Sequence, residues 1–178
     1  IRRRRMVRRY DPQRRVSEEV VIAALERATR APSAGFSQGS DFLVLRSAAE
    51  RTAFWDATTD AAAGGQPDSW LQGLMTAPTL VLCLSDPDHY LERYAEVDKG
   101  WTDRDPTRWP VPYWDVDTGM AAMLLLLTAV EDGLGACFFG VPPDRHTAVR
   151  AALGIPENRR FVGVVSLGYA VLHQRSPS

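Results

Sequence analysis

The sequence is poor in the residues that build metal centres and disulfide frameworks. It contains only two cysteines and three histidines in 178 residues. Cys83 and Cys137 both lie inside apolar runs without a CxxC or Cys/His spacing, which predicts buried, reduced thiols and favours a cytoplasmic protein. His89, His146 and His173 are scattered without the spacing of metal ligands, so no metal site is expected.

Several catalytic motifs are also missing. The sequence has no GxSxG, Walker or HExxH pattern. The glycines of residues 133–143 do not form a GxGxxG fingerprint, and no acidic residue follows at the Rossmann distance, so dinucleotide binding of that kind is disfavoured. The adjacent acids Glu131 and Asp132 near a helix end are interpreted as solvated charge. No side-chain nucleophile or acid–base pair is therefore predicted.

Long apolar runs and an excess of one charge are absent as well. The longest apolar run, residues 120–130, is shorter than the roughly 20 residues that cross a bilayer, so no membrane span is expected. A net charge of −1 gives no global attraction to nucleic acid or to a membrane surface. The first residues lack the apolar segment and cleavage site of a secretion signal, and because no initiating Met is present the true amino terminus is unknown.

What is present is an alternation of helical and strand patterns. A hydrophobic content of 45% predicts one core in a single domain over residues 1–178. Helices are expected over residues 17–31, 47–58, 68–75, 86–97, 113–132 and 143–153, and strands over 42–46, 79–84, 136–139 and 161–167. Residues 61–65 predict a flexible break. Residues 98–112 are polar and rich in proline and Trp, which predicts a long functional loop or lid.

The helix over residues 113–132 is apolar on nearly every face. Such a helix requires burial on all sides. Because this is hard to achieve within one subunit of a small protein, a second subunit is expected to cover part of it.

The beginning of the chain carries a cluster of arginines in residues 4–10. Guanidinium groups match phosphate oxygens, and alternate residues of an extended chain point the same way, so Arg4, Met6 and Arg8 would share one side of a phosphate site. A solvated basic tail and a nucleic-acid-binding arm are the alternatives.

Two further segments have the composition of ligand-binding backbone. Residues 31–38 combine small residues with the hydroxyl groups of Ser33 and Ser37 and the amide of Gln38, although a plain helix-ending loop would look similar. Gly140 follows a strand and would let a flat ligand lie against the backbone. An ordinary strand-to-helix turn is the alternative there.

The order and spacing of these segments resemble the nitroreductase family of FMN enzymes. Residues 4–10 resemble the family's opening Arg-Arg-Ser-x-Arg-x-Phe element, and residues 31–38 resemble its Ala-Pro-Ser-x-x-Asn-x-Gln motif. Residues 117–140 resemble its long apolar helix, Gly-Leu-Gly turn and aromatic strand, and residues 164–169 its last strand with a Gly-Tyr end. The resemblance covers nearly the whole chain.

The resemblance implies a fold, an assembly and a cofactor site. The fold would be α+β, a three-layer α/β/α sandwich with a mixed, mostly antiparallel central sheet, and the long buried helix would form a homodimer interface with FMN bound between subunits. Arg4, Arg8 and Arg175 would hold the FMN phosphate, and the backbone of Gly140 and Val141 would approach flavin N5. The full set implied for FMN comprises Arg4, Arg5, Met6, Arg8, Pro32, Ser33, Ala34, Phe36, Gln38, Phe139, Gly140, Val141 and Arg175.

The implied activity is a ping-pong transfer of electrons from NAD(P)H through FMN to an oxidised small molecule such as a nitroaromatic or a quinone. The flavin carries the redox chemistry, which accounts for the missing catalytic side chains. An aromatic cover over the substrate is predicted from Trp101, Trp109, Tyr113 and Trp114, with core and interface packing as the alternative.

Some positions depart from the family pattern. Met6 replaces a Ser that would offer a hydroxyl to phosphate, Phe36 stands where Asn is common, and Gly39 with Ser40 replaces a Pro-Trp pair. These departures leave open a non-catalytic flavin- or deazaflavin-binding module of the same fold. They also leave open a weaker FMN affinity or an unusual substrate.

Overall fold

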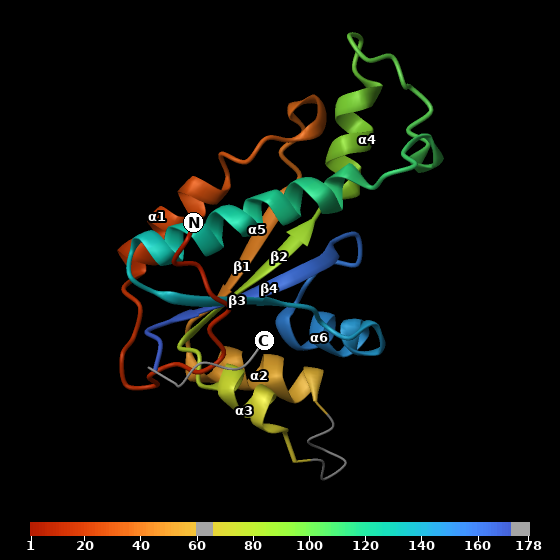
Figure 1. The fold of residues 1–178 in the computed structure, drawn as a ribbon. Coiled ribbons are helices and arrows are strands. Elements are labelled where there is room, and N and C mark those ends of the chain that lie inside the picture. Colours follow the sequence, from red (N-terminus) through yellow and green to blue (C-terminus); the bar gives the residue numbers. More distant parts are fainter. Residues whose placement is uncertain (60–65, 172–178) are drawn as a thin grey trace.

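The computed structural model describes residues 1–59 and 66–171 of the chain (Figure 1). Two expectations, the flexible break at residues 61–65 and the phosphate contact of Arg175, lie outside the described residues. The expected α+β sandwich is confirmed.

A four-stranded antiparallel sheet forms the centre of the molecule. Its strands are β1 (Ser40–Leu45), β2 (Thr79–Ser85), β3 (Gly135–Phe139) and β4 (Arg160–Gly168), in the order β1-β2-β4-β3. All three strand pairings are antiparallel. The parallel component expected of a mixed sheet is reduced, among the described residues, to one isolated bridge that joins Met6 near the start of the chain to Ala136 on β3.

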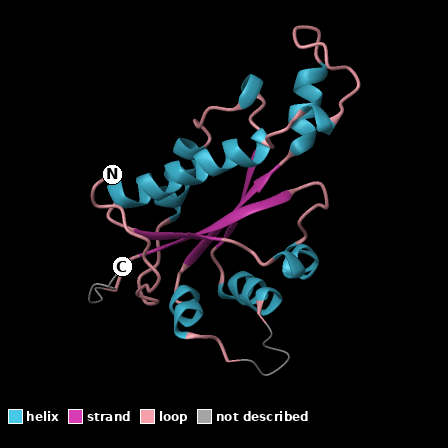
Figure 2. Ribbon diagram, turned by 45° about the vertical axis from the view of Figure 1, so that its right-hand side comes forward, coloured by secondary structure: helices cyan, strands magenta, loops and turns pink. Residues whose placement is uncertain are grey.

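Helices cover both faces of the sheet, as Figures 1 and 2 show. One face is covered by α1 (Glu18–Ala28) and α5 (Tyr113–Glu131), which pack on each other. The other face is covered by α2 (Ala48–Thr58), α3 (Ser69–Met75) and α6 (His146–Leu153). The remaining helix, α4 (Pro87–Ala95), extends past the sheet beside the start of α5 (Figure 1).

The alternation of side chains along β2 supplies both layers of core. Leu80, Leu82 and Leu84 belong to the cluster that includes residues of α2, α3 and α6. Val81 and Cys83 belong to the cluster that includes residues of α1 and α5. Because successive residues of a strand point to opposite faces, an uninterrupted apolar run fits a central strand that is covered on both sides.

Local capping signals place the helix ends close to where the sequence predicts them. Ser47 and Glu50 form a complete capping box at the start of α2, and Asp86 caps α4 ahead of Pro87. Gly154 ends α6 in the left-handed conformation at φ 65°. The helix expected over residues 143–153 is divided into a 3-10 turn over Pro143–Arg145 and α6.

Only part of the apolar surface of α5 is buried within one chain. Val116, Met120 and Met123 are 41%, 38% and 46% exposed, and they follow one another at helical spacing on one face. The opposite face, with Ala121, Leu125 and other buried residues, lies against the sheet and α1. Burial of α5 on all sides, as the sequence predicts, would therefore require a contact from outside this chain.

By length and mean hydropathy, α5 is also the one helix in the described part of the chain that could span a membrane. Half of its span is buried inside the molecule. Because the core helix of a soluble protein can have the same length and hydropathy, these two properties do not by themselves indicate a membrane span.

Candidate functional site

The arginine-bearing segment at the start of the chain lies against β3. Met6 forms its bridge with Ala136, and the Val7 N–H donates to the Ala136 carbonyl at 2.8 Å. Gly135 makes this approach possible, because a Cβ at that position would lie 2.8 Å from the Val7 side chain. The segment is thereby held at the first residues of the strand.

Tyr10 anchors the other end of this segment in the core. Its side chain is fully buried, and its hydroxyl donates to the Val7 carbonyl and shares a 2.8 Å hydrogen bond with Ser166 Oγ on β4. Burial raises the pKa of Tyr10 above its ordinary value, so this hydroxyl stays a donor at any physiological pH. Arg8 and Arg9 therefore lie on backbone that is fixed at both ends, and Arg4 and Arg5 directly precede the first fixed residue, Met6.

The guanidinium groups of Arg4 and Arg5 differ in how many of their nitrogen atoms have hydrogen-bond partners. Arg5 donates to the carbonyl groups of Arg2 at 3.0 Å and Arg4 at 2.9 Å. Arg4 is half-buried, and its Nη1 atom is buried without a hydrogen-bond partner among the described residues. Because a buried, unpaired guanidinium nitrogen is unfavourable, this atom is suited to an anion supplied from outside the chain.

Arg8 and Met6 have different environments. Burial raises the pKa of the Cys137 thiol, and the charge of nearby Arg8 opposes that shift, which puts Arg8 beside the middle of β3. The Met6 side chain is packed against both hydrophobic clusters. Of the three residues predicted to share a phosphate-facing side, Met6 is thus a core contact and contributes at most its backbone.

Gly140 presents open backbone at the end of β3. Phe139 stacks on Trp55 with ring centroids 5.8 Å apart, and Val141 is buried in the core, so the side chains on either side of Gly140 are used for packing. Gly140 itself is exposed, and no atom of residues 1–59 or 66–171 outside its own neighbours lies within 4 Å of the position that a Cβ would take. His146 Nε2 lies 3.1 Å from the Val141 carbonyl and supports this turn.

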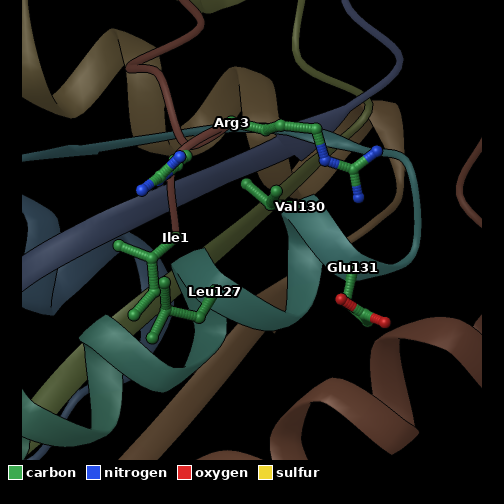
Figure 3. Close-up of a pocket in the computed structure, with 6 residues that line it drawn as sticks. Ile1, Arg3, Leu127, Val130 and Glu131 are labelled. Carbon is green, nitrogen blue, oxygen red and sulfur yellow. The ribbon is translucent and has the colours of Figure 1, made fainter.

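A cavity of about 460 Å³ opens beside the arginine segment (Figure 3). It lies between the first residues of the chain and the end of α5, and it is lined by Ile1, Arg2, Arg3, Leu127, Val130 and Glu131. Figure 3 shows Arg3 extending over this end of α5, where Val130 and Glu131 lie. The apolar residues that line this cavity on α5, Leu127 and Val130, lie on the same helix as the exposed Met120 and Met123.

The second predicted segment, residues 31–38, lies near the opposite end of α5. The Ala34 N–H donates to Asp117 Oδ2 at 2.8 Å, and the Gln38 N–H donates to Ser33 Oγ at 2.9 Å. Pro32, Phe36 and Gln38 are exposed. A cavity of about 240 Å³ here is lined by Ala28, Thr29, Ala31, Pro32, Ser33, Gln38 and Ser40.

The backbone of this loop adopts a conformation that most residues avoid. Gly35, Phe36 and Gln38 have φ values of 62°, 57° and 54°. The left-handed region is open to glycine but costs other residues roughly 1–2 kcal/mol each. Such a loop persists only where its surroundings hold it in place.

The four predicted substrate residues meet in one aromatic cluster. Trp109 is at its centre, with ring centroids between 4.6 and 6.1 Å from its neighbours, which are Tyr90, Tyr94, Trp101, Tyr113 and Trp114. Tyr90 and Tyr94 belong to α4, so the rings of the predicted lid are packed against a helix. The packing alternative thus describes what these rings do within one chain.

The structure separates the predicted site residues into two groups. The arginine group comprises Arg4, Arg5, Met6 and Arg8 along β3, with Phe139, Gly140 and Val141 at the end of that strand. The aromatic group comprises residues 31–38, α4 and the rings of Trp101, Trp109, Tyr113 and Trp114. Asp117, which touches the second group, and Leu127, which lines the cavity beside the first, are ten residues apart on α5, or about 15 Å.

Two residues of this region, Asp117 and Tyr90, are not singled out by any pattern in the sequence. Asp117 is buried on α5 and accepts hydrogen bonds from Ala34 and from the Tyr90 hydroxyl, each at 2.8 Å. Burial, followed by the bond to Asp117, raises the pKa of Tyr90 above its ordinary value. The available signal was the pair Asp117 and Thr118, the polar residues within the otherwise apolar stretch of residues 116–127.

Comparisons with known proteins agree on the nature of the chain. The profile of the Nitroreductase family matches residues 1–169. A relative from Archaeoglobus fulgidus with the provisional name NADH dehydrogenase/NAD(P)H nitroreductase is 32% identical, over 93% of this chain and 80% of that protein.

Solved structures share the fold. A nitroreductase-like protein from Streptococcus mutans has a TM-score of 0.75 at 18% identity, covering 98% of this chain and 90% of that one. An FMN-dependent nitroreductase from Clostridium difficile R20291 has a TM-score of 0.68 at 20% identity, covering 99% of this chain and 88% of that one.

Proposed function

This chain belongs to the nitroreductase family of oxidoreductases, and we propose that it binds FMN and passes electrons from NAD(P)H to an oxidised small molecule in a ping-pong reaction. Nitroaromatics and quinones are the proposed acceptors. The observation that carries the proposal is the half-buried Arg4, whose Nη1 atom has no partner in the described part of the chain, beside a strand that ends in open glycine backbone.

The residues of the arginine group fit a flavin mononucleotide. Arg4 and Arg8 would donate to the phosphate, and four residues of strand, about 13 Å, lead from Ala136 beside Met6 to Gly140. The exposed backbone of Gly140 would lie against the ring system. FMN, when bound, supplies the redox chemistry, so the chain needs to supply only binding, orientation and electrostatics.

The aromatic group would contribute to binding from a partner subunit. We propose a homodimer built on the exposed face of α5, where Val116, Met120 and Met123 lie. In a twofold arrangement with the two α5 helices antiparallel, the aromatic group of one subunit approaches the arginine group of the other. This would unite two sets of residues that lie at opposite ends of α5 within one chain.

The decisive experiment is the visible absorption spectrum of the purified protein, followed by anaerobic addition of NADH and then NADPH. We expect flavin absorption that is bleached by at least one donor and restored by a quinone or nitroaromatic acceptor. A yellow protein that neither donor bleaches would instead support the non-catalytic flavin-binding module. A protein that remains colourless in excess FMN would overturn the proposal.

A further inference from the structure

One carboxylate oxygen joins three parts of the molecule. Asp117 is 3% exposed and lies on the buried side of α5. Its Oδ2 atom accepts a hydrogen bond from the Ala34 N–H in the loop of residues 31–38 and another from the Tyr90 hydroxyl of α4, both at 2.8 Å. Loop, α4 and α5 therefore converge on a single atom.

The loop depends on such contacts. Its left-handed residues Phe36 and Gln38 are unfavourable unless the surrounding structure fixes them. Besides the bond to Asp117, the Arg93 Nε–H donates to the Gly35 carbonyl at 2.9 Å. Just beyond the loop, the Ser40 hydroxyl bonds Thr118 on α5 at 2.8 Å. The loop is thus tied to α4 once and to α5 on both sides of its left-handed stretch.

The aromatic rings rest on the same frame. The Tyr94 ring lies directly over Gly35, where an added Cβ would be 2.6 Å from the ring, and its centroid is 4.6 Å from that of Trp109. Tyr90 packs edge-on against Trp109 and Trp114, with centroids 5.9 and 6.1 Å away. A change at the Asp117 carboxylate therefore reaches the loop through Ala34 and the rings through Tyr90.

We propose that Asp117 is a positioning residue that fixes the loop of residues 31–38 and the aromatic group as one unit, so that a single buried carboxylate sets both FMN affinity and acceptor binding. Its burial means that it acts through Ala34 and Tyr90 and not by contact with a ligand. This inference rests on the proposed function, because it assigns the loop to the cofactor and the rings to the acceptor.

The test compares two substitutions of Asp117 with a matched control on the same helix. Asp117→Leu removes both accepted hydrogen bonds and leaves Ala34 N–H and Tyr90 O–H unpaired. Asp117→Asn removes the charge but retains an oxygen that can accept both bonds, since both now end on Oδ2. Thr128→Val is the control, because Thr128 is also a buried polar residue of α5 but lies eleven residues from Asp117.

Three quantities are measured for each variant: the dissociation constant of FMN from flavin fluorescence, KM and kcat for menadione with the preferred nicotinamide donor, and Tm with saturating FMN. In Asp117→Leu we expect both the FMN dissociation constant and KM to rise about tenfold, with a smaller change in kcat. Asp117→Asn should restore both to within about threefold of wild type, as expected when the acceptor geometry matters more than the charge. Thr128→Val should leave both unchanged.

The outcomes separate this inference from the function on which it rests. A wild-type protein that binds no FMN contradicts the proposed function. If wild type binds FMN and turns over while Asp117→Leu matches Thr128→Val in affinity and KM, the positioning role is wrong and the function stands. An Asp117→Asn variant as impaired as Asp117→Leu would also overturn it.

A fourth variant keeps the test available if Asp117→Leu does not fold. Tyr90→Phe removes only the bond between the ring frame and Asp117 and keeps the bond from Ala34. We expect KM for menadione to rise about threefold with FMN affinity unchanged, as suits the loss of one hydrogen bond. An unchanged KM would contradict the proposed link between Asp117 and the rings.

Discussion

The arginine group and the aromatic group differ most in the kind of buried polar atom that each leaves unpaired among the described residues. In the aromatic group, the loop, α4 and α5 are joined by defined hydrogen bonds at Asp117, Arg93 and Thr118. The buried atoms that this group leaves unpaired are the neutral indole nitrogens of Trp109 and Trp114. In the arginine group the atom without a partner among the described residues is a guanidinium nitrogen of Arg4, and no described residue beyond its own neighbours lies within 4 Å of the position that a Cβ on Gly140 would take. The aromatic group leaves only neutral donors unpaired, whereas the arginine group leaves a charged donor that suits an anion.

This difference suggests separate physical roles. Paired polar groups fix the position of a loop, whereas an unpaired buried charge stores free energy that an incoming anion can release. We therefore expect direct contacts with the FMN phosphate in the arginine group. We expect the residues that shape the acceptor site in the aromatic group.

The largest expected effect comes from separating the two groups in space. Met120→Asp places a carboxylate in the exposed apolar face of α5. Because burying that charge in an interface costs several kcal/mol, we expect the dissociation constant of the dimer to rise on the order of 100-fold. If the groups complete each other across subunits, FMN should be lost at the same protein concentrations at which the dimer dissociates. Analytical ultracentrifugation and flavin absorbance measure the two effects.

Met75→Asp is the matched control for that substitution. Met75 on α3 is 39% exposed, against 38% for Met120, but it belongs to a helix on the opposite face of the sheet. The control variant should keep both the dimer and the flavin. A Met120→Asp protein that remains dimeric, or a wild type that is monomeric with FMN bound, would show that the two groups do not need each other.

The arginine group is tested by Arg4→Ala. Loss of a charged hydrogen-bond donor to phosphate is worth about 1.5–3 kcal/mol, so the FMN dissociation constant should rise about 10- to 100-fold. The FMN-free variant should unfold at no lower a temperature than FMN-free wild type, because a buried unpaired nitrogen has been removed.

Arg9→Ala is the control for Arg4, since Arg9 is an exposed arginine of the same segment. Fluorescence titration with FMN should give a wild-type dissociation constant for it. Equal losses in the two variants would indicate that net positive charge, and not the position of Arg4, accounts for binding. The arginine group would then resemble the solvated basic tail that the sequence leaves as an alternative.

Local chemistry explains which parts of this structure the sequence predicts well. The Ser47–Glu50 capping box, Asp86 with Pro87, and the apolar run of β2 all act within a few residues, and each element forms where these signals place it. The continuity of the β2 run also indicates a strand covered on both faces. These features need no knowledge of distant residues.

The parts that escaped prediction depend on contacts between distant residues. The bond from Ala34 to Asp117 spans 83 positions, and the bridge from Met6 to Ala136 spans far more. No periodicity in the sequence reveals that the Met6 side chain packs in the core. Nor does it reveal that residues 4–10 and residues 31–38, which follow one another in the family pattern, lie near opposite ends of α5. For the same reason, the sequence leaves a lid and core packing as alternatives for the rings of residues 98–112, and their contacts with Tyr94 of α4 appear only in the structure.

The smallest expected effect concerns Phe36, an exposed residue with left-handed backbone in the loop of the aromatic group. Phe36 has a left-handed φ of 57°, and its side chain is 74% exposed, so the ring gains little packing in return for the unfavourable backbone. Asn tolerates this region better than other non-glycine residues, and Phe36→Asn should therefore increase the free energy of unfolding by about 0.5–1 kcal/mol. Urea denaturation of FMN-free protein measures the difference. Phe36→Ala separates the two causes, because it removes the exposed ring but keeps a side chain that disfavours the left-handed backbone; equal stability of the Asn and Ala variants would mean that the backbone at residue 36 is not strained.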